Sequence, residues 1–378
     1  MAVLGAYYLT IPNVTAESIG VILLIGNLAG FLFEIPSGYL SDKMGHKKAL
    51  VFSRVLMTIS SLIFLLADSL TLLILATSIF SIAVAFLSGT GTAFMHETLD
   101  ALGKSDKYTE IMGKIRSISF VVPLILSVMV PFMVEVSFKL PFLVAVIVDL
   151  IGLVIAMMLV SPKVPQVAID EIKATNFRQV IAEGYKIGFF KYAFFSIVLT
   201  SFVFGVVEFG TPYKVLLDVP IIYYGVFFGL GRILASILLA YSGKIKKHFT
   251  ITSFFRFQTL LFFLLMLSLG VSANPIIVVC IFILVEGFRW GLTQIETGFM
   301  LEIIKGSKFK ATLLSTKSQL WYFAGALVGY SMGYSIERIS YQDTYLYAAI
   351  VMVGILTPLW FYIVRSEKKM RLITSSSQ

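Results

Sequence analysis

Long apolar stretches recur along almost the whole chain, and they constrain its fold more than any other feature of the sequence. A helix needs roughly 20 apolar residues to cross about 30 Å of hydrocarbon. The stretches lack the alternation of a transmembrane barrel, so we predict an all-α polytopic membrane protein. The predicted spans are residues 18–40, 49–67, 70–95, 115–136, 138–161, 187–213, 220–243, 249–271, 274–298, 312–335 and 343–364.

The scarcity of charge supports this prediction. Only 13% of the residues are charged and 58% are hydrophobic, whereas soluble domains contain about 25% charged residues. A surface facing water needs more charge, so most of the chain is expected to face lipid or other apolar helices. The single cysteine, Cys280, excludes an internal disulfide framework.

The positions of the basic residues predict the orientation of the chain. Lys and Arg gather in every second connection, and the connections between them hold only Lys139, Lys214 and Arg338. Because cytoplasmic loops carry the excess of basic residues, the net charge of +9 indicates topology rather than nucleic-acid binding. The segments predicted to be cytoplasmic are 43–54, 104–116, 163–191, 244–256, 305–317 and 365–371.

Two segments lie outside the eleven spans. Residues 1–11 are apolar but too short to cross a membrane, and no basic region precedes them as in a signal peptide. We expect them to be the end of a first span that is truncated at the N-terminus. The connection 162–186 contains an amphipathic helix, which fits a position on the membrane surface and equally well a strap packed on the two halves. Its apolar face comprises Phe177, Val180, Ile181 and Tyr185.

The long connection separates two halves with weak internal similarity. A shift of 205 residues aligns 20–38 with 225–243, and Gly26 then meets Gly231. Parallel repeats of this kind are known in transporters. The predicted domains are an N-terminal bundle (1–161), a linker (162–186), a C-terminal bundle (187–364) and a cytoplasmic tail (365–378).

A polar motif, "GYLSDKMGHKK", follows the first repeat. Its glycines allow tight turns and close helix approach, and an acid among bases suits a helix end. The segment resembles the loop signature of the major facilitator superfamily, with His46 in place of the usual Arg. The alternative is that the basic residues of this segment only set the orientation of the chain in the membrane.

The resemblance implies two pseudo-symmetric bundles of six helices, about twelve spans with the first truncated, and transport by alternating access. It also implies a gating role for Gly38, Asp42, Lys43, Gly45, Lys47 and Lys48. The segments "FEIPSG", 85–108 and 310–315 are similar to bacterial export-type members, which predicts proton-coupled efflux of small amphipathic compounds or drugs. The chain departs from those members at Ala85, where Arg is common, and in a fifth helix that has two prolines but no glycine.

Ionisable residues within the spans are candidates for a substrate or proton pathway, because each costs roughly 2.5–3.5 kcal/mol at mid-bilayer on insertion scales. In "VEGFRWGLTQIETG" the polar residues Glu286, Arg289, Thr293 and Glu296 recur along one helical face. Three glycines of the same segment lie on another side, which suits close helix packing. Glu286 and Arg289 are spaced to pair within the helix, so a neutralised structural pair is the alternative to a cavity role.

Other candidates lie on other spans. Arg232 is in mid-span, and Glu286 or Glu208 is its expected partner. Asn27 is the repeat partner of Arg232, and Glu34 follows Asn27 by two turns, near the headgroups. Glu208 lies near the outer end of its span, where it serves as an external gate or meets water.

Asp149 is the most isolated acid. We expect it to pair with a neighbouring helix rather than with substrate, and proton coupling is the alternative. Tyr7, Tyr8, Trp290, Trp321 and Tyr322 are weaker candidates for a cavity lining.

Motifs of enzymes and nucleotide-binding proteins are missing from the sequence. There is no G-x-x-x-x-G-K-[ST] loop, and the three histidines lack metal-ligand spacing. We therefore predict no enzyme, no metal, no cofactor and no ATP, with the proton gradient as energy source. The predicted partners are a small-molecule substrate and membrane lipids, with no nucleic acid. The chain is expected to act as a monomer in the bacterial inner membrane, with its C-terminus in the cytoplasm. A nutrient uptake symporter or uniporter is the alternative, followed by a transporter-like receptor that moves nothing.

Overall fold

The computed structural model describes the chain in two compact units. Unit 1 comprises Met1–Asn176 with Ile221–Val226, and unit 2 comprises Phe177–Pro220 with Phe227–Gln378. The residues outside the description are 1–2, 105–110, 112–114, 116–124, 127, 162–176, 308 and 377–378, together with the side chains at 42, 89, 92, 96, 177, 311 and 369–376.

The described part of the chain is helical and contains no strand. Nine of its helices are long and apolar enough to cross a membrane, and they fall on nine of the eleven predicted spans. The predicted span 115–136 lies partly outside the described residues. The span predicted at 312–335 forms a long helix, α16 (Lys310–Arg338), but this helix is not among the nine. Its sequence mixes Gln, Ser, Tyr and three glycines with the apolar residues, which lowers its hydropathy.

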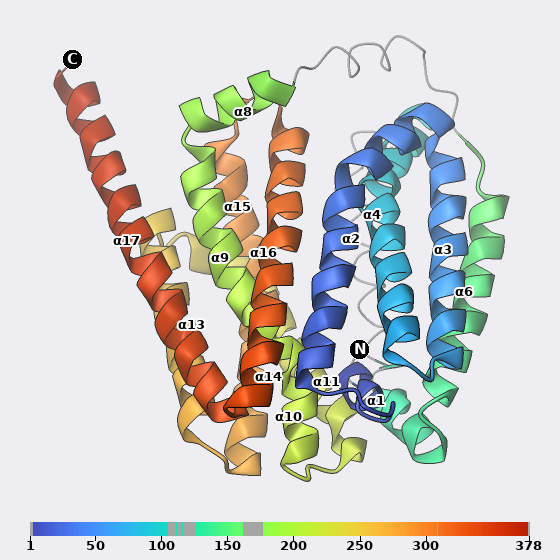
Figure 1. Ribbon diagram of the computed structural model, residues 1–378. Helices are drawn as coiled ribbons and strands as arrows, with labels where there is room; N and C mark the ends of the chain where they lie inside the picture. The colour runs from blue at the N-terminus through green and yellow to red at the C-terminus, as the bar shows by residue number, and fades with distance from the viewer. Residues whose placement is uncertain are drawn as a thin grey trace. The chain divides into compact units, whose positions relative to one another are not determined.

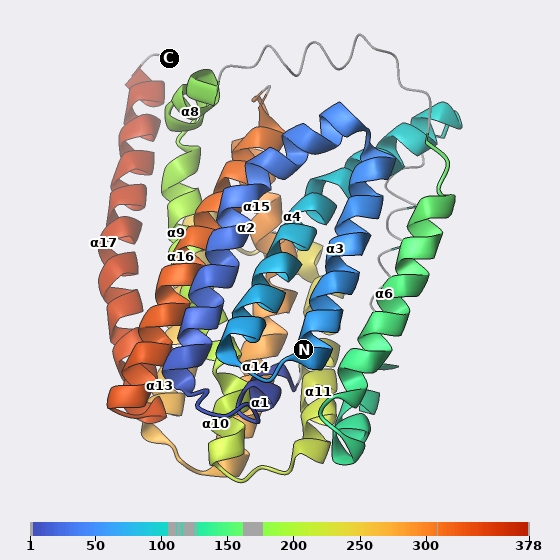
Figure 2. The same ribbon diagram turned by 45° about the vertical axis from the view of Figure 1, so that its right-hand side comes forward.

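Unit 1 contains four long helices that run side by side (Figure 1; Figure 2). In this unit α4 packs against α2 and α3, and α6 packs against α3. The short α1 is fixed at one end, since the Tyr7 hydroxyl donates to the Phe64 carbonyl at 2.6 Å and its ring lies 4.4 Å from that of Phe142. The helices are α1 (Leu4–Tyr8), α2 (Ala16–Met44), α3 (His46–Leu66), α4 (Leu70–Ala101) and α6 (Leu140–Met158).

The α2 helix continues through Pro36. Proline has no backbone N–H and removes one helical hydrogen bond, and the last turns of α2 change direction (Figure 1). The next residue after α2 is Gly45, whose φ of +90° allows α3 to start at once. The predicted tight turn at Gly45 is therefore confirmed.

Unit 2 is built around α9. Of the 18 most apolar consecutive residues in the span Phe189–Leu216, 78% are buried, whereas in α6 the share is 17%. The α9 helix contacts α13, α14, α16 and α17. The helices are α8 (Phe177–Lys186), α9 (Phe189–Glu208), α10 (Gly210–Leu216), α11 (Tyr224–Ala240), α12 (Ser242–Lys246), α13 (Ile251–Val271), α14 (Pro275–Gly291), α15 (Thr293–Ile303), α16 and α17 (Tyr341–Ser376). The short 3-10 turn η2 (Ile221–Tyr223) and the first three residues of α11 belong to unit 1.

Two predicted spans are interrupted helices. The span at 187–213 breaks at Phe209, where Gly210 and Pro212 follow, and proline cannot donate to the Glu208 carbonyl four residues back. The span at 274–298 breaks at Leu292. There the Thr293 hydroxyl bonds back to the Arg289 carbonyl at 2.8 Å, a contact that bends helices.

The amphipathic helix α8 packs on protein. Val180 is fully buried, and a Cβ on Gly184 would lie 2.5 Å from the Phe190 ring of α9 and 2.8 Å from Leu313 of α16. Figure 1 shows α8 lying across the ends of these helices. These contacts lie within unit 2, and the position of α8 on the membrane surface or as a strap on the two halves stays a prediction. Tyr185 is 72% exposed, although the sequence placed it on the apolar face.

Candidate functional site

Three charged residues on α11 and α14 meet around one tryptophan at mid-span, and we call the four the arginine–tryptophan cluster: Arg232, Glu286, Arg289 and Trp290. The Arg232 guanidinium carbon lies 4.5 Å from the Trp290 ring centre, and that of Arg289 lies 5.4 Å from it. The Trp290 indole Nε1 donates to Glu286 Oε2 at 3.1 Å. The indole therefore receives two cations on its ring and donates to the carboxylate.

Glycines bring the two helices close enough for this arrangement. A Cβ on Gly231 would lie 3.1 Å from Glu286 Cβ and 3.3 Å from the Ile283 carbonyl. On the other helix, a Cβ on Gly287 would lie 2.5 Å from Leu234, and a Cβ on Gly291 would lie 2.6 Å from Leu238. The predicted packing role of Gly287 and Gly291 is confirmed, because larger side chains would hold the helices apart.

The depth of the cluster follows from helix geometry. Arg232 lies eleven residues after Ile221, and Glu286 lies eleven residues after Pro275, the first residues of their spans. At about 1.5 Å per residue both side chains begin ~16 Å from that end, close to the middle of a hydrocarbon layer of about 30 Å. All three ionisable residues of the cluster are half-buried rather than sealed.

Two further charged residues of unit 2 act on the cluster. Glu208, the last residue of α9, interacts electrostatically with Arg289 and Glu286. Lys214 on α10 interacts electrostatically with Glu286, and its Nζ lies 5.9 Å from the Phe282 ring centre. Arg232 interacts with Glu286 in the same way, which is one of the two partners that the sequence predicted for it.

Among the described side chains Glu286 and Arg289 do not form the ion pair that was the alternative to a cavity role. Glu286 accepts instead from Trp290, and the Arg289 guanidinium faces the rings of Trp290 and Phe204, the latter at 5.8 Å. The spacing of three residues does place Glu286 and Arg289 on one helical face, but each contacts Trp290 instead of the other.

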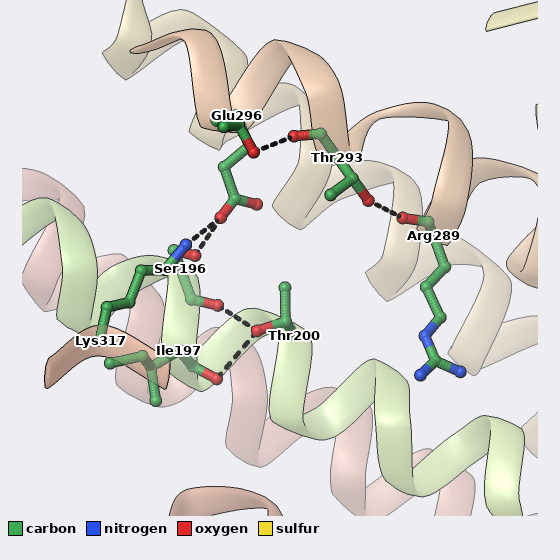
Figure 3. A network of polar contacts seen from close by, with 8 residues as sticks. Ser196, Ile197, Thr200, Arg289, Thr293, Glu296 and Lys317 are labelled. Atoms are coloured by element: carbon green, nitrogen blue, oxygen red, sulfur yellow. Dashed lines mark hydrogen bonds and ion pairs between the residues drawn. The ribbon is translucent and has the colours of Figure 1, made fainter. Parts of the chain in front are cut away.

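A second polar group, the Glu296 network, lies on α9, α15 and α16 (Figure 3). Glu296 is 6% exposed and accepts from Lys317 Nζ at 2.6 Å and from the Ser196 hydroxyl. Figure 3 shows its carboxylate turned toward these two residues, whereas the Arg289 guanidinium points away from it. The predicted polar face of 286–296 is thus divided between two separate groups.

The sequence missed the partner of Glu296. Lys317 was counted with the basic residues of a cytoplasmic connection, although it lies inside α16. The same holds for Arg54, which lies inside α3. A basic residue within a long helix was the available signal, because it must find an acid or reach the surface.

Asp149 in unit 1 pairs with a neighbouring helix. The Ser61 hydroxyl donates to Asp149 Oδ2 at 2.6 Å, and Arg54 lies 4.0 Å from Oδ1. Both partners belong to α3. This arrangement agrees with the expected helix pairing of Asp149.

The loop motif joins three helices of unit 1 through His46. Its Nδ1 shares a hydrogen bond with Ser41 at 2.8 Å, its Nε2 lies 3.0 Å from Glu97, and Thr90 donates to Ser41. Lys43 and Lys48 are exposed and Lys47 is half-buried. The Asp42 side chain lies outside the described part of the chain.

Gly38 lies inside α2, and a Cβ built on it would meet no described atom within 4 Å. The residue before it, Ser37, is buried and donates to the Ala85 carbonyl of α4 at 3.1 Å. The role of Gly38 in close helix approach stays a prediction.

Asn27 and Glu34 lie on α2. The Asn27 amide donates to the Leu23 carbonyl of its own helix at 2.8 Å and is 9% exposed. Glu34 interacts with Ser88 of α4, and its Oε2 is buried without a hydrogen-bond partner in the described part of the chain. Of the two, Glu34 is the one with spare capacity for a proton or a ligand.

The described residues contain no group of three or more His, Cys, Asp or Glu side chains that could hold a metal ion.

Comparison with known proteins gives two kinds of similarity. A sequence model of the Major Facilitator Superfamily matches residues 1–301. A crystal structure of a mutant of the nucleoside transporter NupG aligns with a TM-score of 0.75 and 14% identity, covering 95% of this chain and 94% of that one. A POT family transporter in complex with 5-aminolevulinic acid aligns with a TM-score of 0.71 and 14% identity, over 97% and 92% of the two chains. At such low identity the two structures show the fold alone. No curated protein matches the sequence.

Proposed function

The chain belongs to the major facilitator superfamily and is a multi-pass membrane transporter rather than an enzyme, and from this premise we propose that it is a proton-coupled secondary transporter of small amphipathic molecules. The observation that carries the proposal is the arginine–tryptophan cluster. It holds ionisable groups at mid-span, half-buried, beside aromatic rings. Intramembrane charges of this kind mark substrate and ion pathways.

We infer that Glu286 carries the proton. It is the acid of the cluster, it accepts from the Trp290 indole, and it interacts electrostatically with Arg232 and Lys214. Protonation would remove the negative charge of Glu286, so the cations beside it would attract an anion more strongly. The proposed pathway also includes Arg289 and Glu208 in unit 2, and Asn27 and Glu34 in unit 1. The contacts of Asp149 support a structural role for that acid.

For the overall architecture we propose the two pseudo-symmetric bundles of six helices that the sequence predicts, with alternating access between them. The loop of Gly38, Asp42, Lys43, Gly45, Lys47 and Lys48 is the proposed cytoplasmic gate. Two observations support the gate. The tight turn at Gly45 joins the end of α2 directly to the start of α3, and His46 at this junction contacts Ser41 and Glu97.

Two directions of transport are compatible with this site. Export is the direction that the resemblance to export-type segments favours. Uptake is the second candidate, and the two arginines beside Glu286 favour it. An anion that binds Arg232 and Arg289 also favours protonation of Glu286. Substrate and proton would then move together.

The function is tested in proteoliposomes loaded with a pH-sensitive dye. Ethidium, uridine and 2-naphthoate are added as cationic, neutral and anionic probes. We expect one of them to move protons, outward in step with probe entry for exchange and inward for co-transport. Glu286→Gln should abolish proton movement while probe counterflow persists, because the neutral side chain cannot titrate. Glu337→Gln, at an exposed position of α16, is the matched control. Absence of proton movement with all three probes would contradict the proposal.

The gate is tested in the same vesicles. Asp42→Asn should slow transport at least about tenfold, whereas the exposed Asp68→Asn, between α3 and α4, should leave the rate unchanged. A receptor that moves nothing would show no probe flux in any variant, and equal rates for the two Asp variants would rule out the gating role.

A further inference from the structure

Two cations and one acid meet at Trp290 in the arginine–tryptophan cluster. The guanidinium carbons of Arg232 and Arg289 lie 4.5 and 5.4 Å from the Trp290 ring centre, and Glu286 accepts from the same indole. Two like charges close together at mid-membrane are costly, and a bound anion offsets that cost.

The two guanidinium groups have free hydrogen-bonding capacity. Among the described residues neither Arg232 nor Arg289 donates a side-chain hydrogen bond to protein, and both contact aromatic rings. A guanidinium has five N–H donors in its plane. The ring contacts use none of these donors in a hydrogen bond, so the donors remain available to a ligand. Both residues are half-buried, so a ligand can reach them.

The surrounding rings supply the second half of a binding site. Phe228 lies 4.7 Å from the Arg232 guanidinium, on its own helix, and Phe204 of α9 lies 5.8 Å from that of Arg289. Trp290 is 37% exposed, more than a core residue of its size requires. The partly exposed indole offers an apolar face for a ring or hydrocarbon body. The two guanidinium groups beside it offer planar pairs of N–H donors for a carboxylate.

We propose that unit 2 of this transporter binds an organic anion, a carboxylate on an aromatic or apolar body, with Arg232 and Arg289 holding the carboxylate and Trp290 packing on the body. This inference rests on the proposed function and names the substrate class of the same site. It also predicts that Glu286 opposes binding, because its negative charge competes with the ligand for the same cations.

Binding is measured by calorimetry on the full chain in nanodiscs of zwitterionic lipid. The probes share one ring system and differ in charge: 2-naphthoate, 2-naphthalenemethanol and 2-naphthylmethylammonium. We expect 2-naphthoate to bind at least about tenfold more tightly than the alcohol, since a hydrogen bond to a charged group is stronger than a neutral one, and the ammonium to bind weakest. Equal or tighter binding of the ammonium would overturn the proposal.

Variants separate this site from a structural charge cluster. Arg232→Gln and Arg289→Gln should each weaken 2-naphthoate binding about tenfold or more and leave the alcohol nearly unchanged. Arg338→Gln is the matched control, because Arg338 also stacks on a ring, Tyr334, at 3.4 Å, but at the far end of α16. Glu286→Gln should strengthen binding severalfold, a gain that a misfolded variant cannot produce. Loss of binding in Glu286→Gln equal to that of the arginine variants would refute the proposal.

The outcome is distinguishable from failure of the proposed function. If 2-naphthoate binds as expected but no probe crosses the vesicle membrane, transport is refuted and the anion site stands. If protons move with ethidium alone and the ammonium probe binds best, the anion site is refuted and transport stands.

Discussion

A helix crossing in unit 1 and one in unit 2 each have a glycine at the point of contact, but the polar residue beside the glycine differs. In unit 1, Gly26 of α2 faces Thr77 of α4, where an added Cβ would lie 2.6 Å from the Thr77 methyl carbon. In unit 2, the repeat partner Gly231 of α11 faces Glu286 of α14 at 3.1 Å. The glycine is retained because both crossings need a close backbone approach.

The next residue along each helix differs. Asn27 bonds back to its own helix and is buried, whereas Arg232 reaches over Trp290 on the neighbouring helix. The two crossings thus share a close glycine contact and present different polar groups. We infer that unit 2 carries the charge-selective half of the transporter, and the following changes test this difference.

The largest expected effect comes from the ion pairs, which differ in burial between the units. Glu296→Ala leaves Lys317 without its carboxylate inside unit 2, and breaking a buried pair costs about 3–5 kcal/mol. Asp149→Ala is the counterpart in unit 1. Arg54 is 35% exposed and 4.0 Å from Asp149, so the loss there should be about 1 kcal/mol. Unfolding by SDS titration in mixed micelles measures both, and equal losses would contradict the comparison.

The glycine crossings should give an intermediate effect in both units. Gly26→Ala and Gly231→Ala each place a methyl group inside the contact distance of the facing helix, and such overpacking costs about 1–3 kcal/mol. The same unfolding measurement applies. Gly354→Ala in α17, where an added Cβ meets nothing within 4 Å, should instead stabilise by about 0.5–1 kcal/mol. A stabilising effect of Gly231→Ala would show that the crossing does not require glycine.

The smallest effect is expected in the loop between α2 and α3. Gly45 has a φ of +90°, so Gly45→Ala should cost about 1–2 kcal/mol. Gly38 lies in helix with open space around its Cα, so Gly38→Ala should be neutral or slightly stabilising in the micelle titration. If both variants destabilise equally, the positive φ of Gly45 is not what the loop depends on.

Much of the fold was accessible from the sequence. Nine predicted spans match helices within a few residues, because the length and hydropathy of a membrane helix are local properties. The breaks at Phe209 and Leu292 were not predicted, although Gly210, Pro212 and Thr293 gave partial signals. Such residues also occur in continuous membrane helices, where neighbouring helices compensate the lost hydrogen bonds.

The candidate site was predictable only as a set of residues. Arg232, Glu286 and Arg289 stood out because charge is rare inside a span. Their contacts were not predictable, since Trp290 ranked only among the weak aromatic candidates and proved to be the residue that all three meet.

By itself the sequence determined the all-helical membrane class, the positions of most spans and the glycine-rich face of α14, all of which follow from composition and helical period. The tertiary structure alone decided the partners. Glu296 meets Ser196 and Lys317, 100 and 21 positions away, and Arg232 meets Trp290 on another helix. The physical reason is that a charge inside a membrane must be compensated. Which group compensates it depends on how neighbouring helices are rotated and where they break, and no local pattern records that.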